Sequence, residues 1–143
     1  TRGIKTAFYL SPEFGLARGG AADPELVVEG VACPVGRVML FDKLRGDDPQ
    51  TRLAREFGQA FRKAHPDESP VLAGYAYDAL SLIVNAARKQ GFTAERIRDG
   101  IEQTAEFPGV SGIYNLSPAD HHGPHSAVYE MARIVKGEWV ILR

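Results

Sequence analysis

Cysteine, net charge and long apolar runs are all scarce in this chain. Cys33 is the only cysteine in 143 residues, so an internal disulfide is excluded. The 17 basic and 18 acidic residues give a net charge of −1, which offers no electrostatic basis for binding nucleic acid or an anionic membrane. No apolar run is long enough to span a bilayer. The opening residues, TRGIKTAFYL, lack a basic region followed by a long apolar one, so we expect no signal peptide within them.

Signatures of covalent catalysis and of phosphate binding are also missing. The sequence has no G-x-S-x-G elbow and no G-x-x-x-x-G-K-[ST] loop. The glycines of Gly15–Gly20 lack the spacing of a dinucleotide fingerprint. Cys33 lies in an apolar stretch, where burial makes a thiol less reactive, so we predict that it is a core residue.

The most strongly patterned stretch is Ser69–Gly91, which has the start, body and stop of a helix. Ser69 can cap the helix, Pro70 suits its first position, and Gly91 suits its C-terminal end. Apolar residues recur at three- and four-residue steps and predict one broad buried face, formed by Leu72, Tyr75, Ala76, Ala79, Leu80, Ile83, Ala86 and Ala87. Leu82 and Val84 lie off that face, so the helix is expected to be buried on more than one side.

The flanking elements form an unusual order of strands, helices and strands. The predicted strands are Ile4–Leu10, Leu26–Pro34, Gly112–Leu116, Ala127–Lys136 and Glu138–Leu142, and Lys136–Gly137 is predicted to be a hairpin turn. One helix begins after Asp48 and ends near His65, and another runs from Thr93 to about Glu106. Parallel strands usually alternate with helices one by one. The order therefore fits either an α+β domain or the end of a longer α/β chain.

Polar side chains offer few candidates for chemistry. The loop Asp120–His125 (DHHGPH) holds three of the four histidines, which are common zinc ligands, but the adjacent side chains of His121 and His122 rarely converge on one ion. A structural turn is the favoured interpretation and a metal site the alternative. Asp78 and Glu102 are isolated carboxylates, interpreted as solvated or capping groups, and His65 as a C-terminal cap.

Glu13 follows the first predicted strand, in a loop at its C-terminal end. Open α/β sheets bind ligands in the crevice beyond those strand ends. A carboxylate there can pair with a ligand ammonium, with Ser11 as a hydrogen-bonding group and Phe14 as an apolar wall. The alternative is an exposed loop glutamate.

Several segments, in order, resemble one family. They are IKTAFYLSPEFG, VVEGVACP, DDPQTRLAREFGQAFRKAHPDESP, GYAYDALSLIVNAA and FPGVSGIYNLSPADHHG. Together they are similar to the C-terminal part of periplasmic solute-binding proteins of the branched-chain amino acid ABC-transport type, with the type I periplasmic binding fold. The resemblance covers the chain from Ile4 to Leu142.

The resemblance implies an α/β fold that is the C-terminal portion of a two-lobed protein, with a signal peptide upstream and a periplasmic location. It implies a second-lobe segment at 1–34, an interlobe crossover at 35–47, a first-lobe helical segment at 48–108 and terminal second-lobe strands at 109–143. The ligand, an amino acid or an aliphatic or aromatic carboxylate, would lie in the cleft between the lobes.

Within that cleft the resemblance makes Glu13, with Ser11 and Phe14, a candidate contact, and it adds Gly74 and Tyr75. It implies no enzyme activity and no cofactor, and a membrane permease as partner. We expect weak or no ligand binding by this chain alone, and self-association through exposed sheet edges. A metal-assisted hydrolase using the DHHGPH loop and an interaction domain without a small ligand remain alternatives.

Overall fold

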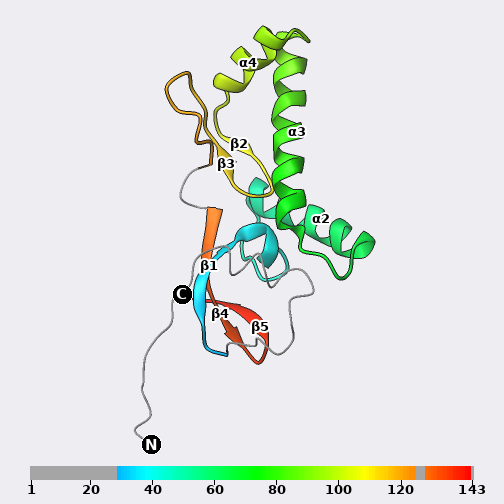
Figure 1. Cartoon of the computed structure of the whole chain (residues 1–143), viewed down its shortest axis with the longest axis vertical. Helices are drawn as coiled ribbons and strands as arrows, with labels where there is room; N and C mark the ends of the chain where they lie inside the picture. The colour runs from blue at the N-terminus through cyan, green and yellow to red at the C-terminus, as the bar shows by residue number, and fades with distance from the viewer. Residues whose placement is uncertain (1–28, 125–127, 143) are drawn as a thin grey trace, which may run out of the picture.

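The structure is a computed structural model that describes residues 29–124 and 128–142. Figure 1 shows the helices toward one end and a three-stranded sheet toward the other. In chain order the elements are β1 (Ala32–Gly36), the 3₁₀ helix η1 (Arg37–Leu40), α2 (Pro49–Ala64), α3 (Pro70–Gln90), α4 (Ala94–Glu102), β2 (Phe107–Pro108), β3 (Ile113–Tyr114), β4 (Tyr129–Val135) and β5 (Glu138–Ile141). The predicted strand Ile4–Leu10 lies outside the described residues.

The larger sheet joins strands from both ends of the described chain. Its order is β1-β4-β5, and both pairs are antiparallel. Cys33 on β1 lies opposite Ala132 on β4, and neither is exposed, which confirms the prediction that Cys33 is a core residue. Lys136 and Gly137 connect β4 to β5 with φ values of 53° and 78°. Two positive φ values are typical of the hairpin turn predicted at these residues.

Three predicted boundaries are wrong. The strand predicted as Leu26–Pro34 overlaps β1, which begins only at Ala32 and continues to Gly36. Pro34 does not end it because β1 lies at the sheet edge, where a missing backbone N–H is tolerated. The helix predicted to reach Glu106 ends at Glu102, and the strand predicted as Gly112–Leu116 is only the pair Ile113–Tyr114 in β3.

The predicted starts of all three helices are confirmed. The Asp48 carboxylate accepts hydrogen bonds from the Thr51 backbone N–H at 2.9 Å and from its hydroxyl at 2.7 Å. The side chains of Ser69 and Thr93 cap α3 and α4 in the same way. These contacts span two or three residues, so local sequence is enough to predict them.

The face predicted to be buried on α3 is mostly exposed, although Ala86 and Ala87 at its end are buried as predicted. Leu72, Leu80 and Ile83 were expected in the core, but they are 71%, 62% and 43% exposed. The buried residues are Val71, Gly74, Asp78, Leu82, Ala86 and Ala87. They form the side of the helix that packs against η1, α2 and α4, and Figure 1 shows α3 rising away from the three-stranded sheet.

The 3₁₀ helix η1 connects the two parts of the core. Its Leu40 belongs to an apolar cluster with Cys33 and Ala132 of the sheet. Its Val38 packs with Val71 of α3 and Val110 of the loop between β2 and β3. Two residues of this short helix, Leu40 and Val38, therefore pack into the sheet part and the helical part of the core, respectively.

We predict that Gly58→Ala destabilises the fold, although alanine favours helices by about 1 kcal/mol. A Cβ atom at Gly58 of α2 would lie 2.3 Å from ring carbons of Phe41, which is only 2% exposed. Overpacking of this kind costs about 1–3 kcal/mol, measurable by urea unfolding. Gly36→Ala is the control, because a Cβ there meets nothing within 4 Å. Equal stabilities for the two variants would contradict the prediction.

Candidate functional site

The contacts between α3 and the loop from β2 to β3 are organised by Asp78. Its side chain is 0% exposed. One carboxylate oxygen accepts from the Val110 N–H at 2.7 Å, and the other from the Ser111 N–H at 2.9 Å and the Tyr114 hydroxyl at 3.0 Å. A buried carboxylate is stable only when donors replace its lost hydration. Asp78 is therefore neither the solvated nor the capping residue that the sequence predicted. We call Asp78, Val110, Ser111 and Tyr114 the Asp78 cluster.

Two glycines allow the loop to approach α3 this closely. A Cβ at Gly109 would lie 2.7 Å from the Asp78 carboxyl carbon and 2.6 Å from the Tyr114 ring. A Cβ at Gly74 would lie 3.1 Å from a methyl group of Val110. Gly74 of the GYAYDA motif and Gly109 of the F-x-G-x-x-G motif therefore lie on opposite sides of the contact between α3 and the loop.

The tyrosine side chains in and near the cluster are uncharged hydrogen-bonding groups. Burial, together with the Asp78 charge, raises the pKa of Tyr114 far above its usual value. Burial also raises the pKa of Tyr75, and the neighbouring Tyr129 phenol adds to the effect. Tyr75 belongs to α3 and Tyr129 to β4, so these two tyrosines lie where the helices meet the sheet. At neutral pH these phenols are uncharged and can form hydrogen bonds with a polar ligand group.

The residues predicted as ligand contacts have different outcomes. Ser11, Glu13 and Phe14 lie outside the described residues. Tyr75 is 36% exposed, so its ring is accessible from solvent. Gly74 is buried against the loop. Sequence reasoning missed the Asp78 cluster, although an aspartate four residues after Gly74 and four before Leu82 gave a signal that this side is packed.

The histidine loop does not converge on one point. The His121 ring pairs with the Glu102 carboxylate at 3.3 Å, whereas the His122 ring pairs with Asp120 at 3.1 Å. Across residues 29–124 and 128–142, no group of three or more metal-ligating side chains is found. His125, the third histidine of the loop, lies outside the described residues. Glu102 was predicted to be an isolated carboxylate. Its pairing with His121 shows that this prediction is wrong.

Two grooves are formed by the described residues near these elements. One, of about 580 Å³, lies between the helices and the β4–β5 hairpin and is lined by Phe41, Phe61 and Trp139 among others. The second, of about 690 Å³, lies between α3 and α4 beside the histidine loop and has mainly aliphatic walls, including Ile83, Ile97, Ile101 and Leu116. None of the described helices is both long and apolar enough to cross a membrane.

Solved structures resemble this chain over almost its full length. Rp1789 of Rhodopseudomonas palustris strain CGA009 matches with a TM-score of 0.78 and 18% identity, over 99% of this chain and 42% of that one. An extracellular ligand-binding receptor from the same species has a TM-score of 0.74 and 19% identity, with the same coverage. The leucine binding protein LivK of Thermotoga maritima MSB8 has a TM-score of 0.63 and 21% identity, over 96% of this chain and 43% of that one.

The chain has the fold of part of a periplasmic binding protein. It spans about two fifths of the length of the solved structures that it matches. Of the three structures named above, the second is called a receptor and the third a binding protein, not enzymes. A scan against protein-family models finds no match, and neither does a search among curated proteins.

We predict that Asp78→Asn destabilises the chain by about 2–4 kcal/mol in urea unfolding. An amide can replace one acceptor oxygen but presents N–H groups to a neighbouring donor, which leaves buried polar groups unpaired. Tyr114→Phe removes only the hydroxyl donor and should cost about 1 kcal/mol. Asp99→Asn on the exposed side of α4 is the matched control. A similar loss of stability in Asp78→Asn and Asp99→Asn would contradict a structural role for Asp78.

We also predict that the stability of the chain falls as the pH rises above about 10, the usual pKa of an unfolded tyrosine. The pKa of Tyr114 is higher in the folded chain, so the folded state keeps a proton that the unfolded state loses. The contribution of this phenol is full below that pH and is lost as the pH approaches the folded pKa. Urea unfolding between pH 8 and pH 11 measures it. Tyr114→Phe should make the decline shallower, and an unchanged slope would contradict the assignment to Tyr114.

Proposed function

We propose that the chain is part of the extracytoplasmic solute-binding component of an ABC uptake transporter. In this proposal it contributes to a cleft between two lobes, formed by 48–108 on one side and by 1–34 and 109–143 on the other, with 35–47 crossing between them. The ligand is an amino acid or a related small carboxylate. The protein acts in the periplasm and uses no cofactor.

The fold supports this proposal most directly. The solved structures that match include a protein named an extracellular ligand-binding receptor and one named a leucine binding protein. Their identities to this chain are 19% and 21%, so the ligand is inferred from the site and not from those names. Ligand pockets commonly lie where two structural units meet, which here is the contact between the helices and the three-stranded sheet.

The observation that carries the proposal is the position of Tyr75. It is a half-buried phenol of α3 beside Tyr129 of β4, so an accessible hydrogen-bonding group lies between the two parts of the structure. A neutral phenol can bind a ligand carboxylate or amine without a change of its own charge. In the proposed cleft, Glu13 binds the ligand ammonium, and Ser11, Phe14 and Gly74 complete the contacts near it.

The partner in this proposal is a membrane permease that recognises the closed form. Closure of two lobes around a ligand is a standard way to convert binding into a change of shape. The crossover at 35–47 includes η1, whose Val38 and Leu40 pack toward different parts of the core. Bending at this crossover would therefore move the helices relative to the sheet.

Amide NMR spectra of the chain during addition of L-leucine test the proposal. We expect weak binding, with dissociation constants of about 1 mM or higher, because a small ligand that touches one wall gains little free energy. The shifted amides should surround Tyr75 and Tyr129. Shifts confined to the groove between α3 and α4 would contradict the proposal.

Two tyrosine variants assign the contact. Tyr75→Phe should weaken leucine binding by about fivefold, because one net hydrogen bond is worth about 1 kcal/mol. Tyr77→Phe is the matched control, since Tyr77 is 41% exposed on the same helix but its ring packs, tilted, against that of Phe57, with the ring centroids 5.2 Å apart. Micromolar binding measured by calorimetry would instead show that the chain alone forms a complete site.

A further inference from the structure

The helices and the three-stranded sheet contact each other mainly through η1. An apolar cluster also joins them there, with Ala54 of α2 and Cys33 of β1 among its members. Apolar burial is not directional, so it constrains the angle between two elements less than a polar contact of defined geometry does. The angle between the helices and the sheet therefore depends on the polar contacts at η1.

Arg37, the first residue of η1, contacts both parts of the structure. Its Nη2 donates a hydrogen bond to the Thr51 hydroxyl of α2 at 3.0 Å, and its Nη1 lies 3.6 Å from a carboxylate oxygen of Glu130 on β4. The guanidinium is a rigid planar fork, so one side chain faces two partners in fixed directions. Arg37 thus joins α2 to β4 through a single charged group. We call Arg37, Thr51 and Glu130 the Arg37 bridge.

The half of the Arg37 bridge that reaches α2 is enclosed and hydrogen-bonded. Thr51 is 0% exposed, and its hydroxyl accepts from Arg37 while it donates to the Asp48 carboxylate at 2.7 Å. A hydroxyl can donate one hydrogen bond and accept others, so both contacts fit its chemistry. The hydrogen bonds from Thr51 hold the pKa of Asp48 below its usual value, and the charge of Arg37 adds to this effect. Arg37 is therefore anchored at the N-terminal end of α2.

The half that reaches β4 is the longer contact. At 3.6 Å the contact between Arg37 and Glu130 is an ion pair and not a hydrogen bond. Their side chains are 16% and 32% exposed, whereas every other ion pair among residues 29–124 and 128–142 has a partner that is more than half exposed. Solvent and salt therefore screen the attraction between Arg37 and Glu130 less than the attraction in those other pairs.

We propose that the Arg37 bridge is a latch that fixes the angle between the helices and the sheet, with Arg37 anchored on α2 and Glu130 as the partner that releases. Movement of the sheet away from the helices breaks the ion pair first, because it is the longer contact and lacks a hydrogen bond. The proposal concerns contacts within this chain and not a ligand, so it goes beyond the proposed transporter role and holds or fails independently of it.

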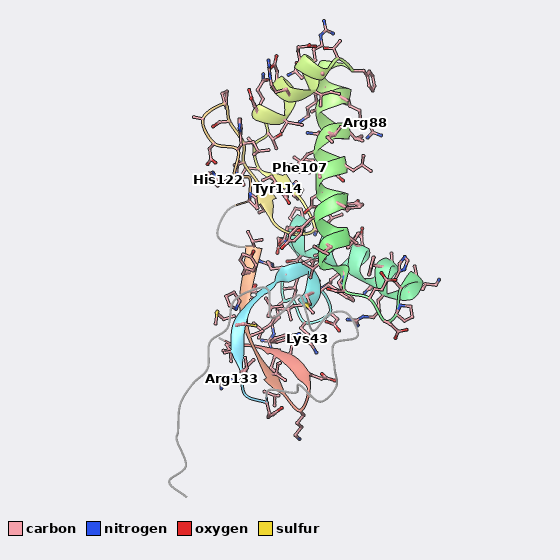
Figure 2. All side chains as sticks on the ribbon, viewed as in Figure 1. Lys43, Arg88, Phe107, Tyr114, His122 and Arg133 are labelled. Carbon is pink, nitrogen blue, oxygen red and sulfur yellow. The ribbon has the colours of Figure 1, made fainter. Side chains whose placement is uncertain are left out.

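Distances between two spin labels in the whole chain, measured by double electron–electron resonance, test the latch. Figure 2 shows Arg88 near the end of α3 that lies away from the sheet, so a label at Arg88→Cys reports on the helices and a label at Val140→Cys on the sheet. Cys33 is 0% exposed and stays unlabelled in the folded chain. Glu130→Gln should raise the fraction of chains outside the main distance peak by about two- to fivefold, the range expected for loss of one partly exposed ion pair.

Glu138→Gln is the matched control for Glu130→Gln. It breaks the ion pair with Lys43, which also joins the segment after η1 to the sheet, but Glu138 is 75% exposed. Its distance distribution should therefore match that of the doubly labelled parent chain. A distribution that Glu130→Gln leaves unchanged, or that Glu138→Gln broadens equally, would overturn the proposal.

Urea unfolding tests which half of the Arg37 bridge is the anchor. Thr51→Val removes the hydroxyl and leaves Arg37 and Asp48 without their enclosed partner, so it should lower the unfolding midpoint more than Glu130→Gln does. Thr51→Ser keeps the hydroxyl and should shift the midpoint less than Thr51→Val. A shift for Thr51→Val no larger than that for Glu130→Gln would overturn the assignment of α2 as the anchored side.

Discussion

A buried carboxylate positions the loop that leads from the helices back toward the sheet. Asp78 holds two backbone N–H groups and one phenol, so the loop cannot leave α3 without exposing three donors and a charge. Burial of a charge costs several kcal/mol, and here three hydrogen bonds offset that cost. The same interaction explains why glycines stand at 74 and 109, where a methyl group would push the loop away.

Features of the fold that depend on residues close in sequence could be predicted, and features that depend on residues far apart in sequence could not. The caps of α2, α3 and α4 depend on neighbours two or three residues away, so residues such as Asp48 identify them directly. The buried side of α3 depends on Val110 and Ser111, which are more than 30 residues away in sequence. Periodicity favoured the richer apolar row, whereas the helix buries the row that contains Gly74 and Asp78, because that row faces the loop.

The candidate site shows the same division. Tyr75 was proposed as a ligand contact because it lies in a recognisable motif, whereas its neighbour Tyr129 belongs to β4 and no local pattern relates the two. The DHHGPH loop attracted a metal hypothesis because histidines are adjacent in sequence. Their rings turn to different carboxylates, His121 to Glu102 and His122 to Asp120. Two histidines that are adjacent in sequence therefore do not form a shared site here, because their side chains point to different partners.

The single thiol lies where the sheet packs against a helix, in one apolar cluster with Ala54 of α2. Cys33 of β1 is fully enclosed by this cluster, whereas the Asp78 cluster belongs to α3 and its loop. An alkylating reagent can modify the thiol only when this cluster opens, so the rate of modification is a clock for that opening. The protein thus contains a built-in reporter that distinguishes opening of the Cys33 cluster from opening of the Asp78 cluster.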